Sequence, residues 1–304
     1  MYTKIILAGG SGYLGQVLTH YYKAKAKEII VLSRQAFAQR GNITFLQWDG
    51  KSKGEWVKEL EGADLLVNLC GKNVNCRYTA KNRAAILKSR VVPTELLLDV
   101  VKELIYPPKV WLQCASATIY RHAEDRYQDE ERGEIGTGFS VDVCKTWESC
   151  FMRADLAGVR KAVLRVSMVL GENDGVFPRL KNLVHAGLGG HQGNGRQYVS
   201  WIHEQDFARI TEWILMHEKM EGVFNVTAPE AISNCDLMKL LRKTYNIPFG
   251  IPTPSWLLEI GAFIIGTETE LVFKSRWVYP KRLVESGFRF QYPQANLAIQ
   301  DLVS

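Results

Sequence analysis

Short apolar segments alternate with longer amphipathic segments along the first half of the chain. Six β-rich runs predict strands at Lys4–Ala8, Glu28–Leu32, Ile43–Gln47, Asp64–Leu69, Lys109–Ala115 and Arg160–Met168. Helical periodicity predicts helices at Tyr13–Ala24, Thr79–Leu104 and Phe139–Leu156, and Pro93 is expected to kink or divide the second of them. Strands joined by helices of this length indicate right-handed crossovers. The predicted fold class is therefore α/β, with a doubly wound parallel sheet.

The pattern changes after Gly171. Residues 187–195 are rich in glycine, and helical periodicity returns at Glu204–His217 and Ser233–Tyr245, with Ser233 as the expected N-cap. We expect a sheet domain at residues 1–170, to which later segments return, and a smaller, mainly helical C-terminal cap at residues 171–304.

Glycine residues follow the first strand at a spacing that suits a phosphate group. Between that strand and the first helix lie Gly9, Gly10, Ser11, Gly12, Tyr13, Leu14 and Gly15. Gly9 permits a tight turn, Gly12 lets a pyrophosphate approach the backbone, and Gly15 allows close helix packing. The N–H groups at the start of the helix would face the phosphates. The pattern predicts a Rossmann-type dinucleotide site, and a structural glycine-rich turn is the alternative.

The end of the second strand favours NADP(H) over NAD. An NAD site has a carboxylate there, which binds the ribose 2′-hydroxyl group. Ser33 and Arg34 occupy that place in this chain, and a guanidinium forms bidentate bonds to a 2′-phosphate. The alternative for Arg34 is a solvated charge at a strand end. Asp49, after the third strand, is placed either to approach the adenine or to cap its own loop.

The fifth strand ends in a polar segment, Cys114-Ala115-Ser116-Ala117-Thr118-Ile119-Tyr120. This strand end, the glycine spacing and the chain length resemble those of the extended short-chain dehydrogenases/reductases, the class of nucleotide-sugar epimerases and dehydratases. The resemblance implies that the Ser116 hydroxyl binds the substrate oxygen whose proton moves as hydride moves.

The chain departs from this class at the Tyr-x-x-x-Lys motif of the next helix. In that motif the lysine charge lowers the pKa of the phenol on the same helical face. The matching segment runs from Val141 to Lys145, so the lysine is present and the tyrosine is absent. Tyr120 or a group on the substrate could replace it. Lys145 either binds the nicotinamide ribose or is a solvated charge.

Further segments are similar to the atypical, YfcH-like "epimerase family protein" branch of these reductases. They are Val67–Gly71, Ile86–Arg90, Cys144–Glu148, Leu164–Gly171, Gly187–Gly190, Gly193–Gln197 and Ser200–His203. The tail, about 248–304, resembles the branch's C-terminal domain of unknown function. The chain has Cys70, Tyr78 and Ser167 where the branch has alanine, tryptophan and glycine.

The branch implies further contacts to NADP(H) and leaves the reaction open. The implied residues are Leu69, Cys70, Gly71, Arg90 and Val169. A charge on the helix surface is the alternative for Arg90. The branch has no settled reaction, and kinship of fold does not supply one.

Four loop residues suggest a place for the substrate between the sheet and the cap. They are Arg77, Arg196, Gln197 and His203. Arg196 follows a Gly-Asn-Gly turn, which could bring a guanidinium and backbone donors to one anion. Structural hydrogen bonds between the cap and the sheet are the alternative for Arg196 and His203.

The composition limits the partners. The chain has 304 residues, of which 46% are hydrophobic and 23% charged, with a net charge of +6, as in ordinary globular proteins. We expect a small-molecule substrate, which could be anionic, and no nucleic acid, because no basic cluster carries interleaved aromatic residues. The apolar run Trp256–Gly266 is too short to span a bilayer, so no membrane partner is expected.

The six cysteines and six histidines show no metal-ligand spacing, so no metal is expected. Free thiols suit a reducing cytoplasm, and the early start of the first strand leaves no room for a targeting peptide. The resemblance to extended reductases suggests a homodimer.

Two functions follow from these patterns. The first is an NADP(H)-dependent oxidoreductase or epimerase acting on a carbonyl or nucleotide-sugar-like compound. The second is a non-catalytic protein that binds or senses NADP(H). The absent tyrosine separates them, because losing a general acid–base group removes about 10²–10⁴-fold in rate.

Overall fold

Parallel strands form the central sheet of the computed structural model, which describes residues 1–35, 37–259 and 273–304. The seven strands of this sheet are β1 (Tyr2–Ala8), β2 (Ala26–Ser33), β3 (Ile43–Gln47), β4 (Leu65–Asn68), β5 (Val110–Ser116), β6 (Arg160–Val166) and β10 (Gly222–Val226). Their order is β10-β6-β5-β4-β1-β2-β3, and every pair is parallel. The strand order reverses between β1 and β4, and ligands of open α/β sheets bind at such a switch point.

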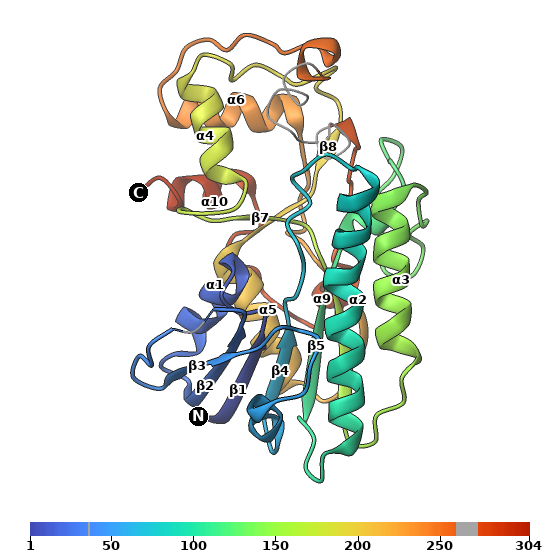
Figure 1. Ribbon diagram of the computed structural model, residues 1–304. Helices are drawn as coiled ribbons and strands as arrows, with labels where there is room; N and C mark the ends of the chain where they lie inside the picture. Colours follow the sequence, from blue (N-terminus) through green and yellow to red (C-terminus); the bar gives the residue numbers. More distant parts are fainter. Residues whose placement is uncertain (36, 260–272) are drawn as a thin grey trace.

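Helices cover both faces of this sheet (Figure 1). On one face lie α1 (Tyr13–Tyr22) and α5 (Glu204–Met216), and on the other lie α2 (Ala80–Glu103) and α3 (Phe139–Arg153). The short α9 (Lys281–Glu285) packs against β10, and the 3₁₀ helices η1 (Glu55–Leu60) and η2 (Ala117–Ile119) follow β3 and β5. Coverage on both faces explains why the strands are almost uninterrupted apolar runs. The predicted Rossmann-type sheet is confirmed.

The long helix α2 is not divided at Pro93. Proline removes one N–H donor from the helix interior, and here the ring is buried, with its Cγ 3.2 Å from a Cβ built on Gly50. Packing of α2 against α3 extends along both helices. The predicted division is wrong because a helix held by such packing tolerates the loss of one hydrogen bond.

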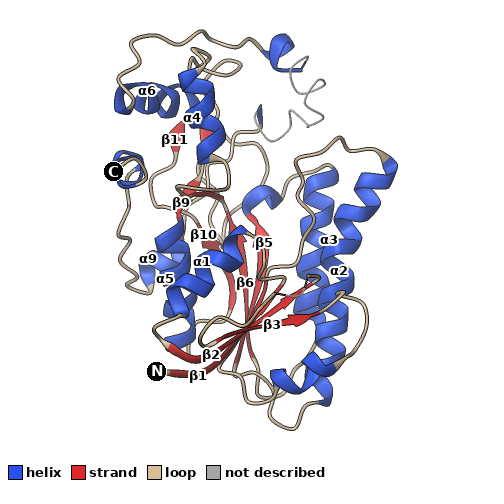
Figure 2. Cartoon of the chain, turned by 60° about the vertical axis from the view of Figure 1, so that its left-hand side comes forward, coloured by secondary structure: helices blue, strands red, loops and turns tan. Residues whose placement is uncertain are grey.

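A second, smaller unit lies beyond one end of the sheet (Figure 2). It contains β7 (Met168–Leu170), α4 (Phe177–His185), β8 (Tyr198–Val199), β9 (Trp201–His203), β11 (Ile232–Ser233), α6 (Asn234–Thr244) and α10 (Ala295–Asp301). Its own apolar cluster includes Phe177, Val184, Met238 and Ile299. The Ser233 hydroxyl accepts a hydrogen bond from the Asp236 N–H (3.1 Å), so the predicted N-cap is confirmed.

The chain passes between the two units several times. After β9 it returns to the sheet as α5 and β10, and then re-enters the cap as β11 and α6. A boundary at residue 170 therefore marks only where the chain first leaves the sheet. Part of the tail expected at 248–304, residues 260–272, lies outside the described residues.

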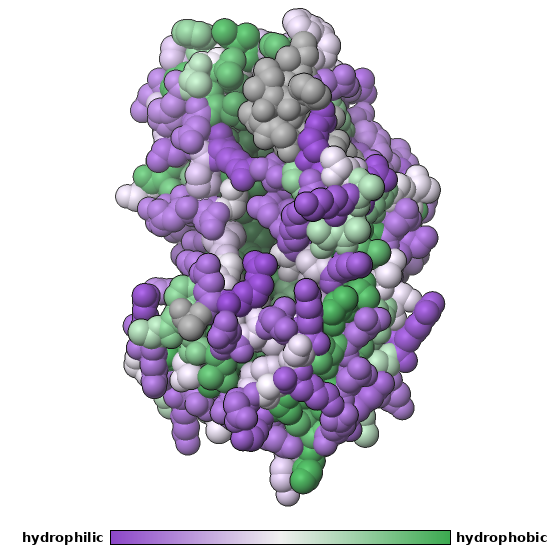
Figure 3. Space-filling view, viewed as in Figure 1, coloured by the Kyte–Doolittle hydropathy of each residue, from purple (hydrophilic) through white to green (hydrophobic). Residues whose placement is uncertain are grey.

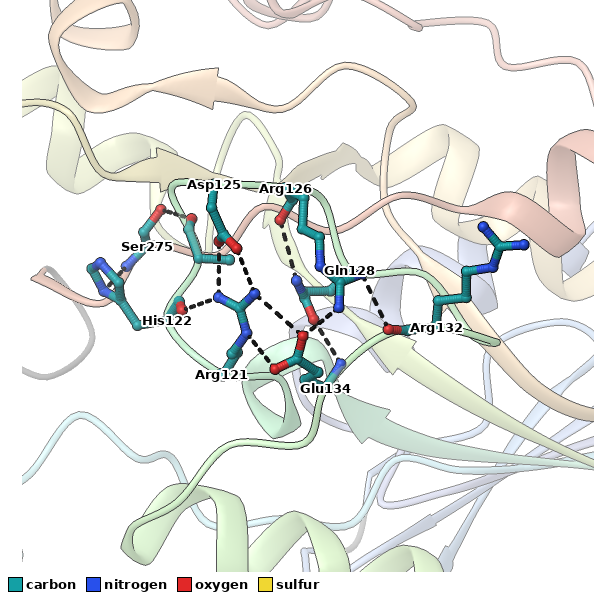
Figure 4. A network of polar contacts seen from close by, with 9 residues as sticks. Arg121, His122, Asp125, Arg126, Gln128, Arg132, Glu134 and Ser275 are labelled. Atoms are coloured by element: carbon teal, nitrogen blue, oxygen red, sulfur yellow. Dashed lines mark hydrogen bonds and ion pairs between the residues drawn. The ribbon is translucent and has the colours of Figure 1, made fainter.

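A polar network fixes the loop after β5 to the C-terminal segment (Figure 4). The Arg121 guanidinium donates to both oxygens of Asp125 (2.9 and 2.8 Å) and to Glu134 (3.0 Å). The Ser275 N–H donates to Nδ1 of His122 (3.1 Å). The loop from 121 to 134 thus holds residues 275–279 beside the end of the sheet.

Neither a membrane-spanning helix nor a cluster of metal ligands occurs in the described ranges 1–35, 37–259 and 273–304. All six cysteines are free thiols. The predicted apolar run Trp256–Gly266 lies largely in the undescribed segment.

Candidate dinucleotide and substrate site

The glycine loop forms the turn between β1 and α1. Gly9 has φ +72°, a left-handed conformation that favours glycine. α1 begins at Tyr13, and its N-cap is Gly12, which has no side chain to cap the N–H groups of the first turn. Such a helix start is a ready binding site for an anion, because its N–H groups and dipole both favour negative charge.

The glycines of this loop serve different purposes. A Cβ on Gly9 would lie 2.9 Å from the Cys70 Sγ, and one on Gly15 would lie 2.1 Å from the Gly10 carbonyl oxygen. Gly9 and Gly15 are therefore required by the packing of the chain itself. A Cβ on Gly12 would have the Gly9 carbonyl oxygen, at 4.0 Å, as its nearest described neighbour. The packing of the described residues therefore does not itself require glycine at position 12.

The end of β4 lies against the glycine loop. The Leu69 N–H donates to the Ala8 carbonyl (2.8 Å), and the Cys70 N–H donates to the Asn68 Oδ1 (3.1 Å). Burial raises the pKa of the Cys70 thiol to about 12, so the group is neutral. Cys70 therefore acts here as a packed side chain against Gly9, rather than as a nucleophile.

A buried polar network supports this end of β4. The Asn68 amide donates to Thr94 Oγ1 (3.1 Å) and Gln113 Oε1 (3.0 Å), and the Trp147 indole also donates to Thr94 (3.1 Å). These residues come from β4, α2, β5 and α3. A satisfied network of this kind fixes side chains in one arrangement, and here it sets the position of the Cys70 backbone.

Ser33, the last residue of β2, and Arg34, which follows it, differ in exposure to solvent. Ser33 is buried and its hydroxyl accepts from the Gln35 N–H (3.2 Å), whereas Arg34 is exposed. Arg34 lines a cavity of about 540 Å³ with Trp48, Lys51 and other residues of the loop after β3. The Arg34 guanidinium therefore lies in an open cavity at the end of β2, beside further positive charge.

Asp49 caps its own loop. Its carboxylate accepts from the N–H groups of Lys51 (2.8 Å) and Ser52 (2.9 Å), and these hydrogen bonds hold the pKa of Asp49 below its usual range. Of the two readings of Asp49, the structure favours the cap.

Arg90 lies where the end of β4 meets α3. Its Nη1 donates to the carbonyls of Lys72 and Ile86 (both 3.1 Å), and its guanidinium carbon is 5.3 Å from the centre of the Trp147 ring. A Cβ on Gly71 would lie 3.2 Å from that carbon. Burial lowers the pKa of Arg90, but a guanidinium remains charged. The residue is thus a half-buried cation beside Gly71.

The helical face of α3 differs from the expected one. Ser140, Cys144 and Glu148, four residues apart, face the inside: Ser140 Oγ lies 3.4 Å from the Tyr78 hydroxyl, Cys144 is buried, and Glu148 pairs with the Arg165 guanidinium (2.8 Å). Lys145 is exposed and lines a groove between α2 and α3 on the outer surface. Val141, at the place of the absent tyrosine, is 1% exposed, whereas the exposure of Lys145 favours the solvated charge of its two expected roles.

Tyr120 is also unsuited to replace the absent tyrosine. The side chain is 1% exposed, its hydroxyl donates to Asn225 Oδ1 (2.9 Å), and it accepts from the Arg165 guanidinium (2.8 Å). Burial raises the pKa of Tyr120. We correct its proposed acid–base role, because both hydrogen-bonding directions of the phenol are already used inside the protein.

Ser116 lies at the C-terminal end of β5, half-buried. Its hydroxyl donates to Thr118 Oγ1 (3.0 Å) and accepts from the Thr118 N–H (3.2 Å). The adjacent Ala117 packs with Val141 and Cys144 in one apolar cluster. This contact brings the serine to the start of α3, as a substrate-binding serine requires.

The expected substrate residues divide into two groups. Arg77 is half-buried and Arg196 is exposed, so their guanidinium groups remain candidates for a substrate anion. Gln197 is 2% exposed and donates to the Gln192 carbonyl (2.9 Å). The buried His203 accepts from the Gln205 N–H (3.2 Å) at the start of α5, and its Nε2 is 3.3 Å from Asp301. We correct the last two assignments: both side chains hold the cap together.

The sequence analysis missed one contact that joins the glycine loop to the cap. The Tyr13 hydroxyl donates to Glu204 (2.7 Å), and Gly171 is so close that its Cβ would lie 1.8 Å from the Tyr13 oxygen. Val169, two residues earlier, pairs with Ile202. Burial and Glu204 raise the pKa of Tyr13. The one available signal was Gly171, three residues after the end of the predicted strand Arg160–Met168.

The surface is hollowed between the cap and the sheet, with hydrophilic residues along the rim of the recess (Figure 3). A glycine loop at the switch point, a half-buried arginine and a serine at the end of β5 together define a dinucleotide-binding α/β protein. The chain belongs to the NAD dependent epimerase/dehydratase family, whose model matches residues 5–227. Residues 253–302 match a domain of unknown function, DUF1731.

Relatives match over almost the whole chain. The epimerase family protein YfhF of Bacillus subtilis is 28% identical over 302 residues, which cover 99% of this chain and 98% of YfhF. A crystal structure of the human epimerase family protein SDR39U1 with NADPH superposes with a TM-score of 0.87 at 25% identity, covering 99% of both chains. A nucleoside-diphosphate sugar epimerase from Corynebacterium glutamicum has a TM-score of 0.78 at 27% identity, covering 98% of this chain and 57% of that one.

Proposed function

We propose that the protein binds NADP(H) and acts as an oxidoreductase or epimerase on a carbonyl or nucleotide-sugar-like substrate. The observation that carries the cofactor assignment is Gly12, a glycine at the helix start that the chain's own packing does not require. Arg34 after β2 supports the phosphorylated dinucleotide. The human relative that superposes over the whole chain was crystallised with NADPH.

The residues present fit this cofactor. Bound NADPH would supply hydride to a carbonyl carbon, and the pyrophosphate would lie at the start of α1, between Gly9 and Tyr13. Ser116 would bind the substrate oxygen from the end of β5. The support for a nucleotide-sugar-like substrate is the family and the Corynebacterium glutamicum epimerase.

Thermal unfolding with NADPH, NADP⁺, NADH and NAD⁺ at matched concentrations tests the cofactor. A ligand at 100 times its Kd stabilises the fold by about 2.7 kcal/mol. We expect Tm to rise with the two phosphorylated forms, and this preference to disappear in Arg34→Ala. Arg40→Ala, an exposed arginine before the start of β3 and so at the opposite end of these strands, is the control. No rise with any of the four dinucleotides would exclude the proposal.

One observation favours a second candidate, a non-catalytic NADP(H)-binding or sensing protein. The inward stripe of α3 contains Ser140, Cys144 and Glu148 and so offers neither a phenol nor an ammonium group. The two candidates differ in hydride transfer. Incubation with NADP⁺ and a panel of nucleotide sugars, followed by mass spectrometry and sugar analysis, would show oxidation or epimerisation only for the first candidate.

We also propose that the substrate carries negative charge and that the protein forms a homodimer. Arg77 and Arg196 supply the positive charge for an anionic substrate. The groove between α2 and α3, about 860 Å³, has the exposed acids Glu95 and Asp99 on α2 and bases such as Lys145 on α3. A two-fold axis along this groove would place acids opposite bases.

A further inference from the structure

The contacts described above trace a continuous path away from the phosphate loop. Gly9 packs against Cys70, the next residue Gly71 packs against the Arg90 guanidinium, and Arg90 lies over Trp147 of α3. A dinucleotide with its pyrophosphate at the glycine loop would extend its nicotinamide end along this path. The side chains around Arg90 are therefore the ones to search for a proton donor.

Tyr78 stands at the end of this path. It comes from the loop between β4 and α2, directly before the N-cap Thr79. Its ring packs edge-on against Phe139 (4.9 Å between ring centres), and its hydroxyl lies 3.4 Å from Ser140 Oγ. The side chain is half-buried. The phenol thus lies over the start of α3, on the inward stripe that lacks a tyrosine of its own.

Ser116 lies on the other side of the same helix start. Its neighbour Ala117 packs against Val141, which follows Ser140 in α3. Tyr78 therefore approaches α3 from the β4–α2 loop while Ser116 approaches it from the end of β5. A substrate oxygen bound by Ser116 would then face the phenol of Tyr78, which comes from the β4–α2 loop. The tyrosine of the family motif would come from α3 instead.

Arg90 supplies a nearby positive charge. Its guanidinium interacts electrostatically with both Tyr78 and Cys144. A positive charge near a phenol favours its ionised form. Burial raises the pKa of the Cys144 thiol to about 12, so Cys144 is neutral at physiological pH and does not compete for this charge.

We propose that Tyr78 is the proton donor and acceptor for the substrate oxygen, with the Arg90 guanidinium as the neighbouring positive charge. This inference rests on the proposed function. In carbonyl reduction, the carbonyl carbon receives hydride from NADPH, the C=O electron pair moves to oxygen, and that oxygen takes the Tyr78 proton. The phenolate beside Arg90 regains a proton from water. NADPH, the carbonyl and one proton thus give NADP⁺ and an alcohol.

A phenol titration tests the pair without requiring a substrate. Seven other tyrosines have pKa values raised by burial, namely Tyr2, Tyr13, Tyr21, Tyr22, Tyr120, Tyr245 and Tyr292. We expect tyrosinate absorbance to reveal one phenol that ionises below the ordinary value of about 10. Tyr78→Phe, which keeps the ring, should remove it, and Arg90→Gln should move it upward. Tyr106→Phe, an exposed control, should leave it unchanged.

Two results of the titration would overturn the proposal: no phenol of lowered pKa, or one that persists in Tyr78→Phe. With any carbonyl compound that the wild type reduces, Tyr78→Phe should lower kcat by about 10²–10⁴-fold and leave the Kd of NADPH unchanged; an unchanged kcat would also overturn it. Failure of the proposed function has a different signature, namely no thermal stabilisation by NADPH in the wild type.

Discussion

At the scale of single residues, Gly12 separates cofactor binding from folding. An alanine Cβ meets no described atom closer than 4.0 Å, and φ at Gly12 is −79°, which any residue adopts. Gly12→Ala should therefore change the free energy of unfolding by no more than about 1 kcal/mol. The methyl group would stand where the pyrophosphate approaches, so the Kd of NADPH should rise at least about tenfold, which corresponds to 1.4 kcal/mol. Calorimetric titration and urea unfolding measure the two effects.

Gly15→Ala is the matched comparison for Gly12. Its Cβ would lie 2.1 Å from the Gly10 carbonyl oxygen, so Gly15→Ala should lower the free energy of unfolding. Weaker NADPH binding by this variant would therefore reflect the damaged fold and not a contact with the cofactor. Wild-type affinity in Gly12→Ala would contradict the assignment of the pyrophosphate to this loop.

His203 gives the cap a dependence on pH. Burial holds the pKa of His203 below its usual value, against the opposing influence of Asp301 and Asp206. The unfolded chain therefore binds the proton more readily than the folded one, and stability should fall as pH drops below about 6.5. His203→Asn retains an acceptor for the Gln205 N–H. Urea midpoints between pH 5 and 7.5 should vary less in this variant than in the wild type; equal slopes would contradict the prediction.

At the scale of elements, a buried ion pair ties α3 to β6. Glu148 and Arg165 are 9% and 11% exposed and share several hydrogen bonds. Removing one partner of such a pair costs about 3–5 kcal/mol, because the other charge stays buried. Glu148→Gln should show this loss in urea unfolding. Glu134→Gln, in the exposed network of Figure 4, should cost less than about 1 kcal/mol.

The sequence predicted the elements that have a local pattern and missed those that depend on distant contacts. Strands β1 to β6 were predictable because burial on both faces makes them continuous apolar runs. β10 was not, since its five residues become a strand only through pairing with β6, about sixty residues earlier in the chain. The burial of Glu148 on α3 was not predictable, because its partner Arg165 lies on β6. Such tertiary contacts leave no local pattern.

At the scale of the whole molecule, the cofactor half of the site was more predictable than the substrate half. Glycines and strand ends lie on one local βα unit, so their chemistry can be read from neighbouring residues. The contacts of Tyr13 with Glu204 and of Tyr78 with Ser140 join segments 191 and 62 residues apart. Gln197 and His203 were misassigned because the folding of the cap, not the local sequence, buries them.

The outer groove between α2 and α3 is the proposed interface of the homodimer. Pairing across a two-fold axis would set Glu95 and Asp99 of one copy against Lys145 and Arg153 of the other. We expect sedimentation equilibrium to show a dimer that weakens with salt, since screening reduces exposed charge pairs. Reversing both acids to lysine should weaken association at least about tenfold, which is 1.4 kcal/mol, and reversing Lys145 and Arg153 as well should restore it. A monomer at every concentration, or dimers indifferent to these reversals, would show that this groove is not the interface.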